Sequence, residues 1–450
     1  MKLDIAKTYN LGLKPKQVRT CECDLGYETG RFFAYSESEN VDPCQANVYP
    51  WQKPMHIAMY GAKGQQLWHR ELGLGLAPGI WFMPFIAFDL DEDGVDEIWF
   101  INNTSKHPFE PTSMVLERVN SINGKTIAQY PFNAQNIAYD YFITEAYRYI
   151  IFAGYVKGEP VILTQQGIYE NMYIQCYNRD MSLRWDKVIG LKDGPRASHS
   201  WPVFDINDDG IDEVLIGERA ISLNDGSEIM CGARDSFFGH SDVVTPFTDY
   251  RTGKKLIFTC RESGNYVGCP RLVMFDYNGE KVWERVYIDP DPNIYCHGHI
   301  HRGYVVTMEP DLKRVAIGVN IDGSVYAYEA VSGEPVELPI ALTLRHRPLD
   351  IDGDGYHEYI NEDGCELYDP SGKLLYRAGG KLIQVGKVEN LPGEQFISFY
   401  EDEGVVRIWQ DSEARDSEAL SIRYEGSFHQ RMNKMMGNSY NFMCSIDCAG

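Results

Sequence analysis

The chain has 450 residues, of which 44% are apolar and 13% aromatic, and its net charge at pH 7 is −23. A chain this negative repels nucleic acid and anionic membranes, so we expect neither as a partner. The sequence contains no run of 18 apolar residues, which argues against a transmembrane helix.

The start of the chain, MKLDIAKTYNLGLKPKQ, lacks the apolar stretch of a signal peptide. The 11 cysteines follow no disulfide-framework spacing, so reduced thiols are expected. The sequence therefore predicts a cytoplasmic protein, or a secreted or periplasmic one if a leader was trimmed. Its oligomeric state has no signal in the sequence.

Seven segments have the pattern of a β-hairpin, in which alternating apolar runs flank a turn such as N-G, D-G or S-G. In chain order they are 59–72, 119–132, 176–188, 220–232, 275–288, 326–339 and 367–380. Their turns recur at intervals of about 40 to 57 residues, the size of a four-stranded propeller blade. The sequence thus predicts an all-β fold, a β-propeller with seven blades or, alternatively, eight. We expect one domain over 1–450, with 1–50 as an irregular closing or capping segment and 430–450 as a candidate ring-closing strand.

Three loops share the pattern D-x-(D/N)-x-D-G-x-x-E: DLDEDGVDE at 89–97, DINDDGIDE at 205–213 and DIDGDGYHE at 350–358. This spacing places hard oxygen ligands around a glycine-assisted turn, as calcium-binding loops do. Short β-type apolar runs flank each loop, so we expect it to join two strands within a blade. An Asp turn that holds no ion is the alternative. The candidate ligands of structural Ca²⁺ are Asp89, Asp91, Asp93, Glu97, Asp205, Asn207, Asp209, Glu213, Asp350, Asp352, Asp354 and Glu358.

Histidines gather in short stretches, among them GPRASHSWP at 194–202, FGHSD at 238–242 and CHGHIHRG at 296–303. In a propeller, segments that enter the innermost strands rim the central channel, where ligands usually bind. Imidazole and thiolate suit Zn²⁺, so these stretches also predict a transition-metal site. An active-site histidine cluster or plain turn histidines are the alternatives. The candidate zinc ligands are His199, His240, Cys260, His297 and His299.

The segment LTQQGIYENMYIQCYN at 163–178 carries Tyr169, Tyr173 and Tyr177. A phenol near an arginine can act as an acid or base when its pKa is lowered; an aromatic cross-strand ladder is the alternative. The sequence has no G-x-S-x-G, P-loop, Rossmann or H-E-x-x-H motif, so serine-triad hydrolysis and nucleotide chemistry have no support.

The order of several motifs carries a resemblance to a known family. These motifs are QQGIYENMYIQ, RASHSWPVFDINDDGIDEVLIGERAISLNDG, GHSDVVTPF, IFTCRES, GHIHRGYV, RPLDIDGDGYHEY and GNSYNF, which together span 163–442. Their order resembles the seven-bladed β-propeller polysaccharide lyases, particularly the ulvan lyases of families 24 and 25. More distantly it resembles the rhamnogalacturonan lyases of family 11.

The resemblance implies β-elimination on a uronic-acid-containing, rhamnose-linked oligo- or polysaccharide, an anionic partner. That reaction needs a group that neutralises the carboxylate, a base for the C5 proton and an acid for the leaving oxygen. The resemblance implies Arg196 as the carboxylate clamp, His107 as the catalytic histidine, and Tyr173 or Tyr169 as the acid or base. It also implies a structural zinc ion held by His and Cys. Further candidates for substrate binding are Arg302, Arg261 and His346.

Two other functions remain open. A glycoside hydrolase of the rhamnosidase type would use the same scaffold, but it needs two carboxylates about 5–10 Å apart. The sequence offers no such pair outside the Asp-rich loops. A non-catalytic propeller that binds a glycan or a protein is the other alternative, because the fold alone implies no activity.

Overall fold

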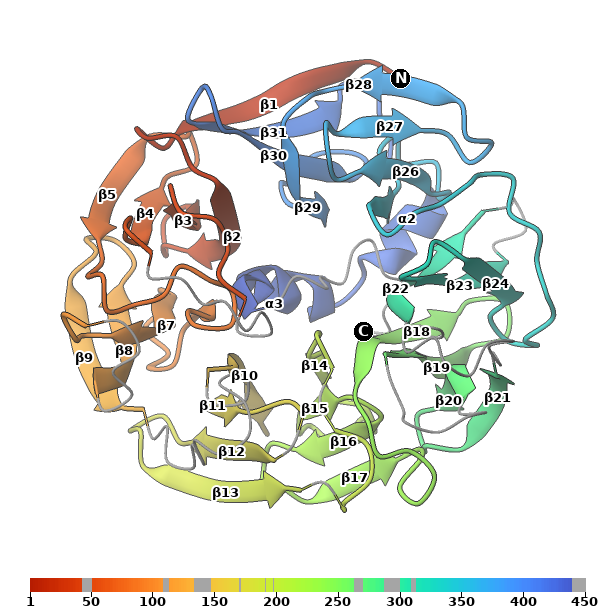
Figure 1. Cartoon of the computed structure of the whole chain (residues 1–450), viewed down its shortest axis with the longest axis horizontal. Coiled ribbons are helices and arrows are strands. Elements are labelled where there is room, and N and C mark those ends of the chain that lie inside the picture. The colour runs from red at the N-terminus through yellow and green to blue at the C-terminus, as the bar shows by residue number, and fades with distance from the viewer. Residues whose placement is uncertain are drawn as a thin grey trace.

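Eight β-sheets stand around a common axis like the blades of a propeller (Figure 1). Seven sheets have four strands, and one has three in the part of the chain that the structure describes. The computed structural model describes residues 1–42, 51–107, 113–132, 147–169, 171–190, 192–196, 198–262, 270–286, 300–308 and 313–438. The predicted all-β propeller is confirmed. The prediction of seven blades is wrong, and the alternative of eight is the observed number.

Blades 1 to 4 follow one another along the chain, and each runs from the channel outward to the rim (Figure 1). Blade 1 comprises β2 (Gln17–Asp24), β3 (Thr29–Ser36), β4 (His56–Tyr60) and β5 (Gln66–Glu71). Blade 2 comprises β6 (Phe85–Phe88), β7 (Glu97–Asn103), β8 (Met114–Asn120) and β9 (Thr126–Pro131). Blade 3 comprises β10 (Tyr149–Val156), β11 (Glu159–Gln166), β12 (Met172–Tyr177) and β13 (Leu183–Ile189). Blade 4 comprises β14 (Val203–Phe204), β15 (Glu213–Ile216), β16 (Arg219–Ser222) and β17 (Glu228–Cys231).

Blades 5 to 8 complete the ring. Blade 5 comprises β18 (Ser241–Asp249), β19 (Lys254–Arg261), β20 (Pro270–Asp276) and β21 (Lys281–Val286). Blade 6 comprises β22 (Ile300–Thr307), β23 (Arg314–Asn320) and β24 (Val325–Glu329). Blade 7 comprises β25 (His346–Leu349), β26 (Glu358–Asn361), β27 (Glu366–Tyr368) and β28 (Leu374–Arg377). Blade 8 comprises β29 (Lys381–Gly386), β30 (Gln395–Tyr400), β31 (Val405–Asp411) and β1 (Leu3–Asn10).

The strand order of blade 8 explains why the hairpin pattern predicted seven blades and not eight. Each predicted hairpin overlaps the outer strands of one of blades 1 to 7, although in blade 6 the described outer strand is β24 alone. In blade 8 the outermost strand is β1, which pairs antiparallel with β31 from Leu3 with Asp411 to Asn10 with Val405. These strands are far apart in the sequence, so no hairpin joins them. Within 1–50, the described residues 1–42 are therefore not an irregular segment, because they supply β1, β2 and β3.

Most residues of the inner strands are buried because both faces of these strands pack against neighbouring blades. β7 and β23 are buried at every position, whereas the outermost strand β9 alternates between exposed and half-buried residues. Apolar clusters fill the space between blades. One of them unites Phe258 and Trp283 of blade 5 with Val305 and Ala316 of blade 6. Dense packing of this kind fixes the first strands around the channel.

The last described elements are helical: α2 (Glu418–Arg423), α3 (Phe428–Lys434) and the 3₁₀ turn η2 (Met436–Asn438). α3 lies in the middle of the ring and contacts β2, β6 and β14 (Figure 1). Arg431 Nη1 donates to Asp212 Oδ2 over 2.6 Å, and Lys434 Nζ lies 2.7 Å from Asp96 Oδ2. The described part of 430–450 is thus helical, and β1 is the strand that closes the ring. Within the described residues, no helix has the length and apolarity needed to cross a bilayer.

Candidate functional site

The two faces of the propeller carry different groups. The first strand of every blade begins at one face, here called the site face, and turns into the second strand at the other, the loop face. The Asp-rich loops 89–97, 205–213 and 350–358 join β6 to β7, β14 to β15 and β25 to β26. Each loop therefore connects two strands of one blade, as predicted, and lies on the loop face.

The three loops share their local hydrogen bonds. The carboxylate of the first Asp accepts from a glycine N–H five residues later: Gly94 to Asp89 (2.9 Å), Gly210 to Asp205 (2.7 Å) and Gly355 to Asp350 (2.9 Å). These glycines have φ of +87°, +82° and +101°, in the left-handed region that side chains disfavour. The last Glu of each loop also accepts a backbone N–H, so both carboxylates are held against the loop backbone.

Each of the three loops has a carboxylate oxygen that a divalent cation could bind. Asp91 Oδ1, Glu213 Oε1 and Asp350 Oδ1 are buried and have no hydrogen-bond partner among the described residues. Burial raises the pKa of Glu213 to about 8, and burial likewise raises the pKa of Asp350. Ligand oxygens of Asp350, Asp352 and Glu358 lie within 4.8 Å of one another. Buried anionic oxygens without donors are the groups that a cation would stabilise.

Three histidines and two carboxylates meet on the site face, in blades 4, 5 and 6. We call this group the histidine–carboxylate cluster; its members are His199, His240, Asp242, Glu262 and His301. Asp242 is its centre, with Oδ1 3.4 Å from His199 Nδ1 and 3.6 Å from His240 Nε2. The other oxygen of Asp242 contacts His301 Nδ1, and Glu262 contacts His240 Nε2.

Blade topology brings these side chains together from distant parts of the sequence. A parallel bridge between Ser198 and Ser241 sets the segment before β14 beside the start of β18. His199 N–H then donates to the carbonyl of Asp242 over 3.3 Å. Glu262 follows the end of β19, which returns to the same face.

Burial and charge separate the histidines of the cluster. Burial lowers the pKa of His199 to about 3 despite the neighbouring Asp242, so its imidazole is neutral. Burial also opposes a charge on His240, but Glu262 and Asp242 outweigh it and raise that pKa to about 9. The pKa of Asp242 lies well below its usual range because the histidines outweigh burial. Imidazole nitrogens and carboxylate oxygens this close together can hold a metal ion.

The aromatic side chains of Tyr169 and Trp81 lie beside the histidine–carboxylate cluster. The ring of Tyr169 meets that of His240 edge to face, with centroids 4.5 Å apart. The guanidinium of Arg148 lies 4.7 Å from the Tyr169 ring centroid and 4.5 Å from that of Trp81. Trp81 in turn contacts the His199 ring, with centroids 5.2 Å apart. Tyr169, predicted as an acid or base, is therefore at the cluster.

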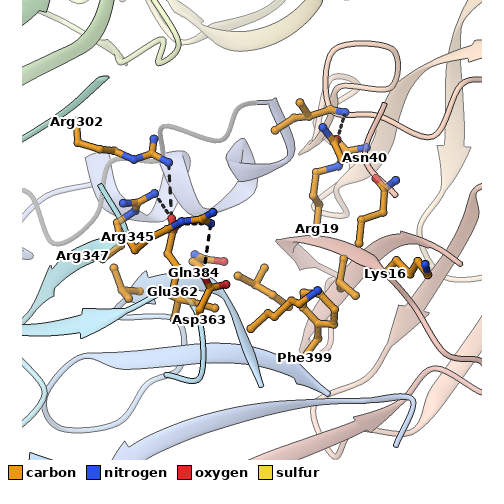
Figure 2. Close-up of a pocket in the computed structure, with 17 residues that line it drawn as sticks. Lys16, Arg19, Asn40, Arg302, Arg345, Arg347, Glu362, Asp363, Gln384 and Phe399 are labelled. Carbon is orange, nitrogen blue, oxygen red and sulfur yellow. Dashed lines mark hydrogen bonds and ion pairs between the residues drawn. The ribbon is translucent and has the colours of Figure 1, made fainter. Parts of the chain in front are cut away.

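A pocket of about 410 Å³ lies between blades 6, 7, 8 and 1 (Figure 2). Its residues include the starts of β2, β22, β25 and β29 and the chain after β26, which places it on the site face. We call it the basic pocket, since these charged side chains line it: Lys16, Arg19, Arg302, Arg345, Arg347, Lys381, Glu362 and Asp363. In a chain of net charge −23, six cations around one pocket attract anionic ligands locally.

Three arginines of the basic pocket converge on one carboxylate (Figure 2). Arg302 Nη2 and Arg345 Nη1 each lie 3.7 Å from Glu362, which Arg347 also contacts. One carboxylate cannot neutralise three guanidinium groups. Asp363, 3.7 Å from Arg345, is the second anion here. The side chain of Arg345 is 62% exposed and is thus the most accessible of the three arginines to a ligand.

Arg19 lies on the opposite side of the basic pocket (Figure 2). It is 7% exposed, and its Nη1 donates to the carbonyls of Met83 and Gly437, both over 2.8 Å. Its Nε and Nη2 have no hydrogen-bond partner among the described residues. Burial lowers its pKa to about 9. A buried guanidinium with free N–H groups beside a pocket is suited to receive an anion.

β22 joins the two parts of the site. His301, which contacts Asp242, is followed directly by Arg302, which lines the basic pocket. The histidine–carboxylate cluster and the basic pocket are therefore neighbours along one innermost strand.

Of the other predicted catalytic residues, only Arg196 lies near the cluster. It is buried, and its Nη2 donates to the carbonyl of Phe238, two residues before His240. Tyr173 is half-buried on β12, and His107 is exposed beyond the end of β7. Neither has a contact with the cluster in the described part of the chain.

The predicted substrate-binding residues have different surroundings. Arg302 lines the basic pocket, and His346 is buried beside it, with Nδ1 3.1 Å from the N–H of Thr343. Arg261 is bonded through two nitrogens to the buried Glu218, over 2.7 and 2.6 Å. We leave Arg261 out of the site because this pair already neutralises its charge.

The predicted zinc ligands are only partly brought together. His199 and His240 belong to the cluster. Cys260 does not: its side chain packs in the apolar cluster with Phe258 and Trp283, and burial raises its pKa well above the usual range. A thiol in apolar surroundings stays protonated and is a poor ligand. His297 and His299 lie outside the described residues.

Sequence reasoning missed Asp242, Glu262 and His301. All three stand inside motifs that the sequence singles out, GHSD, CRES and GHIH. The available signal was the position of these motifs next to strand ends in successive blades. The two carboxylates were not predicted as ligands because only histidine and cysteine were considered.

No family model matches the chain. Among curated proteins, rhamnogalacturonan endolyase YesW of Bacillus subtilis (strain 168) is 24% identical over 222 residues, 42% of this chain and 34% of that protein. Rhamnogalacturonan exolyase YesX of the same organism is 23% identical over 415 residues, 78% of this chain and 64% of that protein. The chain thus spans about one third and just under two thirds of the length of these relatives.

Solved structures of such lyases share the fold. The crystal structure of exotype rhamnogalacturonan lyase YesX superposes with a TM-score of 0.78 at 17% identity, over 97% of this chain and 80% of that one. The Bacillus licheniformis rhamnogalacturonan lyase PL11 gives the same TM-score and identity, over 98% and 81%. These relatives belong to the more distant of the families that the motifs resemble.

Proposed function

We propose that this chain is a polysaccharide lyase that cleaves a rhamnose-linked, uronate-containing saccharide by β-elimination, and that the site face carries the reaction. The observation behind this proposal is the adjacency of His301 and Arg302, which joins the histidine–carboxylate cluster to the basic pocket. The similarity to proteins named as rhamnogalacturonan lyases supports this substrate class over the ulvan alternative.

In this proposal the basic pocket binds uronate carboxylates. A guanidinium binds a carboxylate through two parallel hydrogen bonds, which also makes the neighbouring C5 proton more acidic. Arg345 is exposed enough to do so, and Arg19 offers unpaired N–H groups from the other side. Arg345 and Arg19 would then each bind one end of a short anionic saccharide.

Tyr169 is our candidate for the proton transfer. It contacts His240 of the cluster and carries the guanidinium of Arg148 against its ring. A nearby cation stabilises the phenolate form, which is the form that can accept the C5 proton. His107 and Tyr173 remain weaker candidates because the described structure brings neither to the cluster. Arg196 would hold the segment that carries His240 in position, through its hydrogen bond to the carbonyl of Phe238.

The cluster is proposed to hold a transition-metal ion, with Zn²⁺ favoured by its imidazoles. His199 and His240 would supply nitrogen ligands, and Asp242 and Glu262 oxygen ligands. When bound, such an ion adds a positive charge next to the site. On the loop face, the loops 205–213 and 350–358 are proposed to hold structural Ca²⁺, since hard oxygen ligands suit that ion.

The test is the appearance of an unsaturated uronate, followed by its ultraviolet absorbance, during incubation with rhamnogalacturonan. Arg345→Ala should lower kcat/KM about 10- to 100-fold, because a hydrogen bond to a charged group contributes about 1.5–3 kcal/mol. Arg377→Ala is the control, since Arg377 is equally exposed and lies on β28, the outermost strand of blade 7. Absence of absorbance with every uronate-containing saccharide would reject the proposal.

One observation favours the glycoside hydrolase alternative. Ligand oxygens of Asp242 and Glu262 lie within 4.8 Å, close to the roughly 5 Å separation found in retaining hydrolases. However, Asp242 has no exposed surface, so a sugar cannot reach it. New reducing ends without absorbance would nevertheless establish hydrolysis. Saccharide binding without new ends would establish a binding propeller.

A further inference from the structure

Arg118 on β8 is placed against the Asp-rich loop 89–97. Its guanidinium contacts the carboxylates of Asp91 and Glu97, the third and ninth residues of the loop. The guanidinium also lies 5.4 Å from the centroid of the Trp99 ring, which fixes it from one side. The two carboxylates that Arg118 contacts are two of the predicted cation ligands.

Among the described residues, no arginine contacts two ligand carboxylates of either of the other two Asp-rich loops. In blade 2, Arg118 pairs across the strands with Trp99, two residues after the last Glu of the loop. The equivalent pair in blade 4 is Leu215 with Ala220, and that in blade 7 is Ile360 with Leu367. Blades 4 and 7 therefore have short or apolar side chains where blade 2 has a cation.

Each loop has one buried carboxylate oxygen without a described hydrogen-bond partner, Asp91 Oδ1, Glu213 Oε1 or Asp350 Oδ1, so the loops differ in the cations that contact them. In loop 205–213, Glu213 has one buried oxygen without a partner, and no described cation pairs with its carboxylate. In loop 350–358, Arg423 contacts one predicted ligand carboxylate, that of Asp350, over 3.2 Å, and donates to the carbonyl of Gly355 over 3.1 Å; the other oxygen of Asp350 has no described partner. In loop 89–97, Arg118 contacts one oxygen of each of two ligand carboxylates, those of Asp91 and Glu97.

A second cation contacts the fourth residue of loop 89–97, as Lys255 contacts Asp208 in loop 205–213 over 3.1 Å. Arg179, from the turn between β12 and β13 of blade 3, donates to Glu92 over 2.6 Å and contacts the carbonyl of Asp91. Loop 89–97 thus has two guanidinium groups on it. A divalent ion there would be repelled by Arg118 at short range.

We propose that Arg118 takes the place of a divalent cation in loop 89–97, so that only the loops 205–213 and 350–358 bind one. The carboxylates of Asp89, Asp91 and Glu97 are close enough together to hold an ion. A guanidinium satisfies two of them without any ion, because its N–H groups match carboxylate oxygens. Blade 2 would then keep its fold in the absence of calcium.

The test measures the number of Ca²⁺ ions that the full chain binds, by isothermal titration calorimetry. The number for each variant is compared with that for the unmodified chain. Asp91→Asn should leave the number of bound ions unchanged, whereas Asp352→Asn, at the equivalent position of loop 350–358, should lower it by one. Arg118→Gln should raise the number by one, because it frees the carboxylates while retaining hydrogen-bonding capacity.

A loss of one ion in Asp91→Asn would overturn the proposal, since the loop would then hold calcium beside Arg118. A folded Arg118→Gln variant with an unchanged number of ions would also overturn it. If Arg118→Gln does not fold, the result for Asp91→Asn is sufficient to test the proposal, because this variant retains Arg118.

Discussion

Arg431 of α3 donates to Asp212 of blade 4 over 2.6 Å, across 219 residues of sequence. Asp212 is 5% exposed, and its carboxylate also accepts a hydrogen bond from the N–H of Tyr155. The helix in the middle of the ring is thereby anchored to the loop face by an almost buried charge.

Loss of this anchor should destabilise the fold. Arg431→Ala leaves the buried carboxylate of Asp212 without its cation, which should lower the free energy of unfolding by about 1–3 kcal/mol. Urea denaturation measures this change. Lys14→Ala is the control, since the pair of Lys14 with Asp402 is exposed and should contribute less than about 1 kcal/mol. Equal effects of the two variants would show that Arg431 does not anchor α3.

Removal of divalent cations should also destabilise the protein. Without an ion, burial disfavours the charged form of Glu213 and Asp350 and raises the pKa of both carboxyl groups. A chelator should therefore lower the melting temperature, and added Ca²⁺ should restore it. Glu213→Gln should reduce this response, because the variant no longer buries that charge. A melting curve that is insensitive to chelator would count against calcium in these loops.

Tyr169 and Tyr173 should differ in their effect on catalysis. Loss of a proton-transfer group typically costs about 100-fold or more in rate, so Tyr169→Phe should lower kcat by at least that factor. KM should change little, since the ring and its contact with His240 remain. Tyr173→Phe should be close to wild type, because Tyr173 has no described contact with the cluster. A large loss of kcat in Tyr173→Phe together with little change in Tyr169→Phe would assign the proton transfer to Tyr173 on β12.

Stability should fall in mild acid through His346. Burial lowers the pKa of this histidine, and Arg347 lowers it further, so the folded state resists protonation more than the unfolded state does. The contribution is complete above the unfolded pKa of about 6.5 and is lost as the pH falls below it. His346→Asn should show a smaller loss between pH 8 and pH 5.5 in urea denaturation. An unchanged loss would assign the acid sensitivity to other groups.

Much of the fold was predictable because its signals are local. Each hairpin turn lies between adjacent strands of one blade, and each Asp-rich loop carries its own ligands and its glycine in nine consecutive residues. Blade 8 was missed because β31 and β1 meet only in the closed ring. The helices α2 and α3 were missed because short, mixed-polarity segments carry little periodic signal.

The site was predictable only in part, for a related reason. His199 and His240 were found from their neighbours in sequence. Asp242, Glu262 and His301 join them only because blades 4, 5 and 6 place their strand ends side by side. Cys260 was wrongly grouped with the histidines because the sequence does not show which side of β19 its thiol occupies.

The pairing of β1 with β31 has a consequence for how the protein folds. The hydrogen bond from Lys2 N–H to Asp411 connects residues 409 positions apart, and contacts so distant in sequence form slowly. Blades 1 to 7 take their strands in consecutive order and can assemble during synthesis. β31 keeps an unpaired edge until β1 docks on it, and such an edge readily pairs with another chain. Aggregation of newly made protein should therefore begin at β31, and folding at high dilution should suppress it.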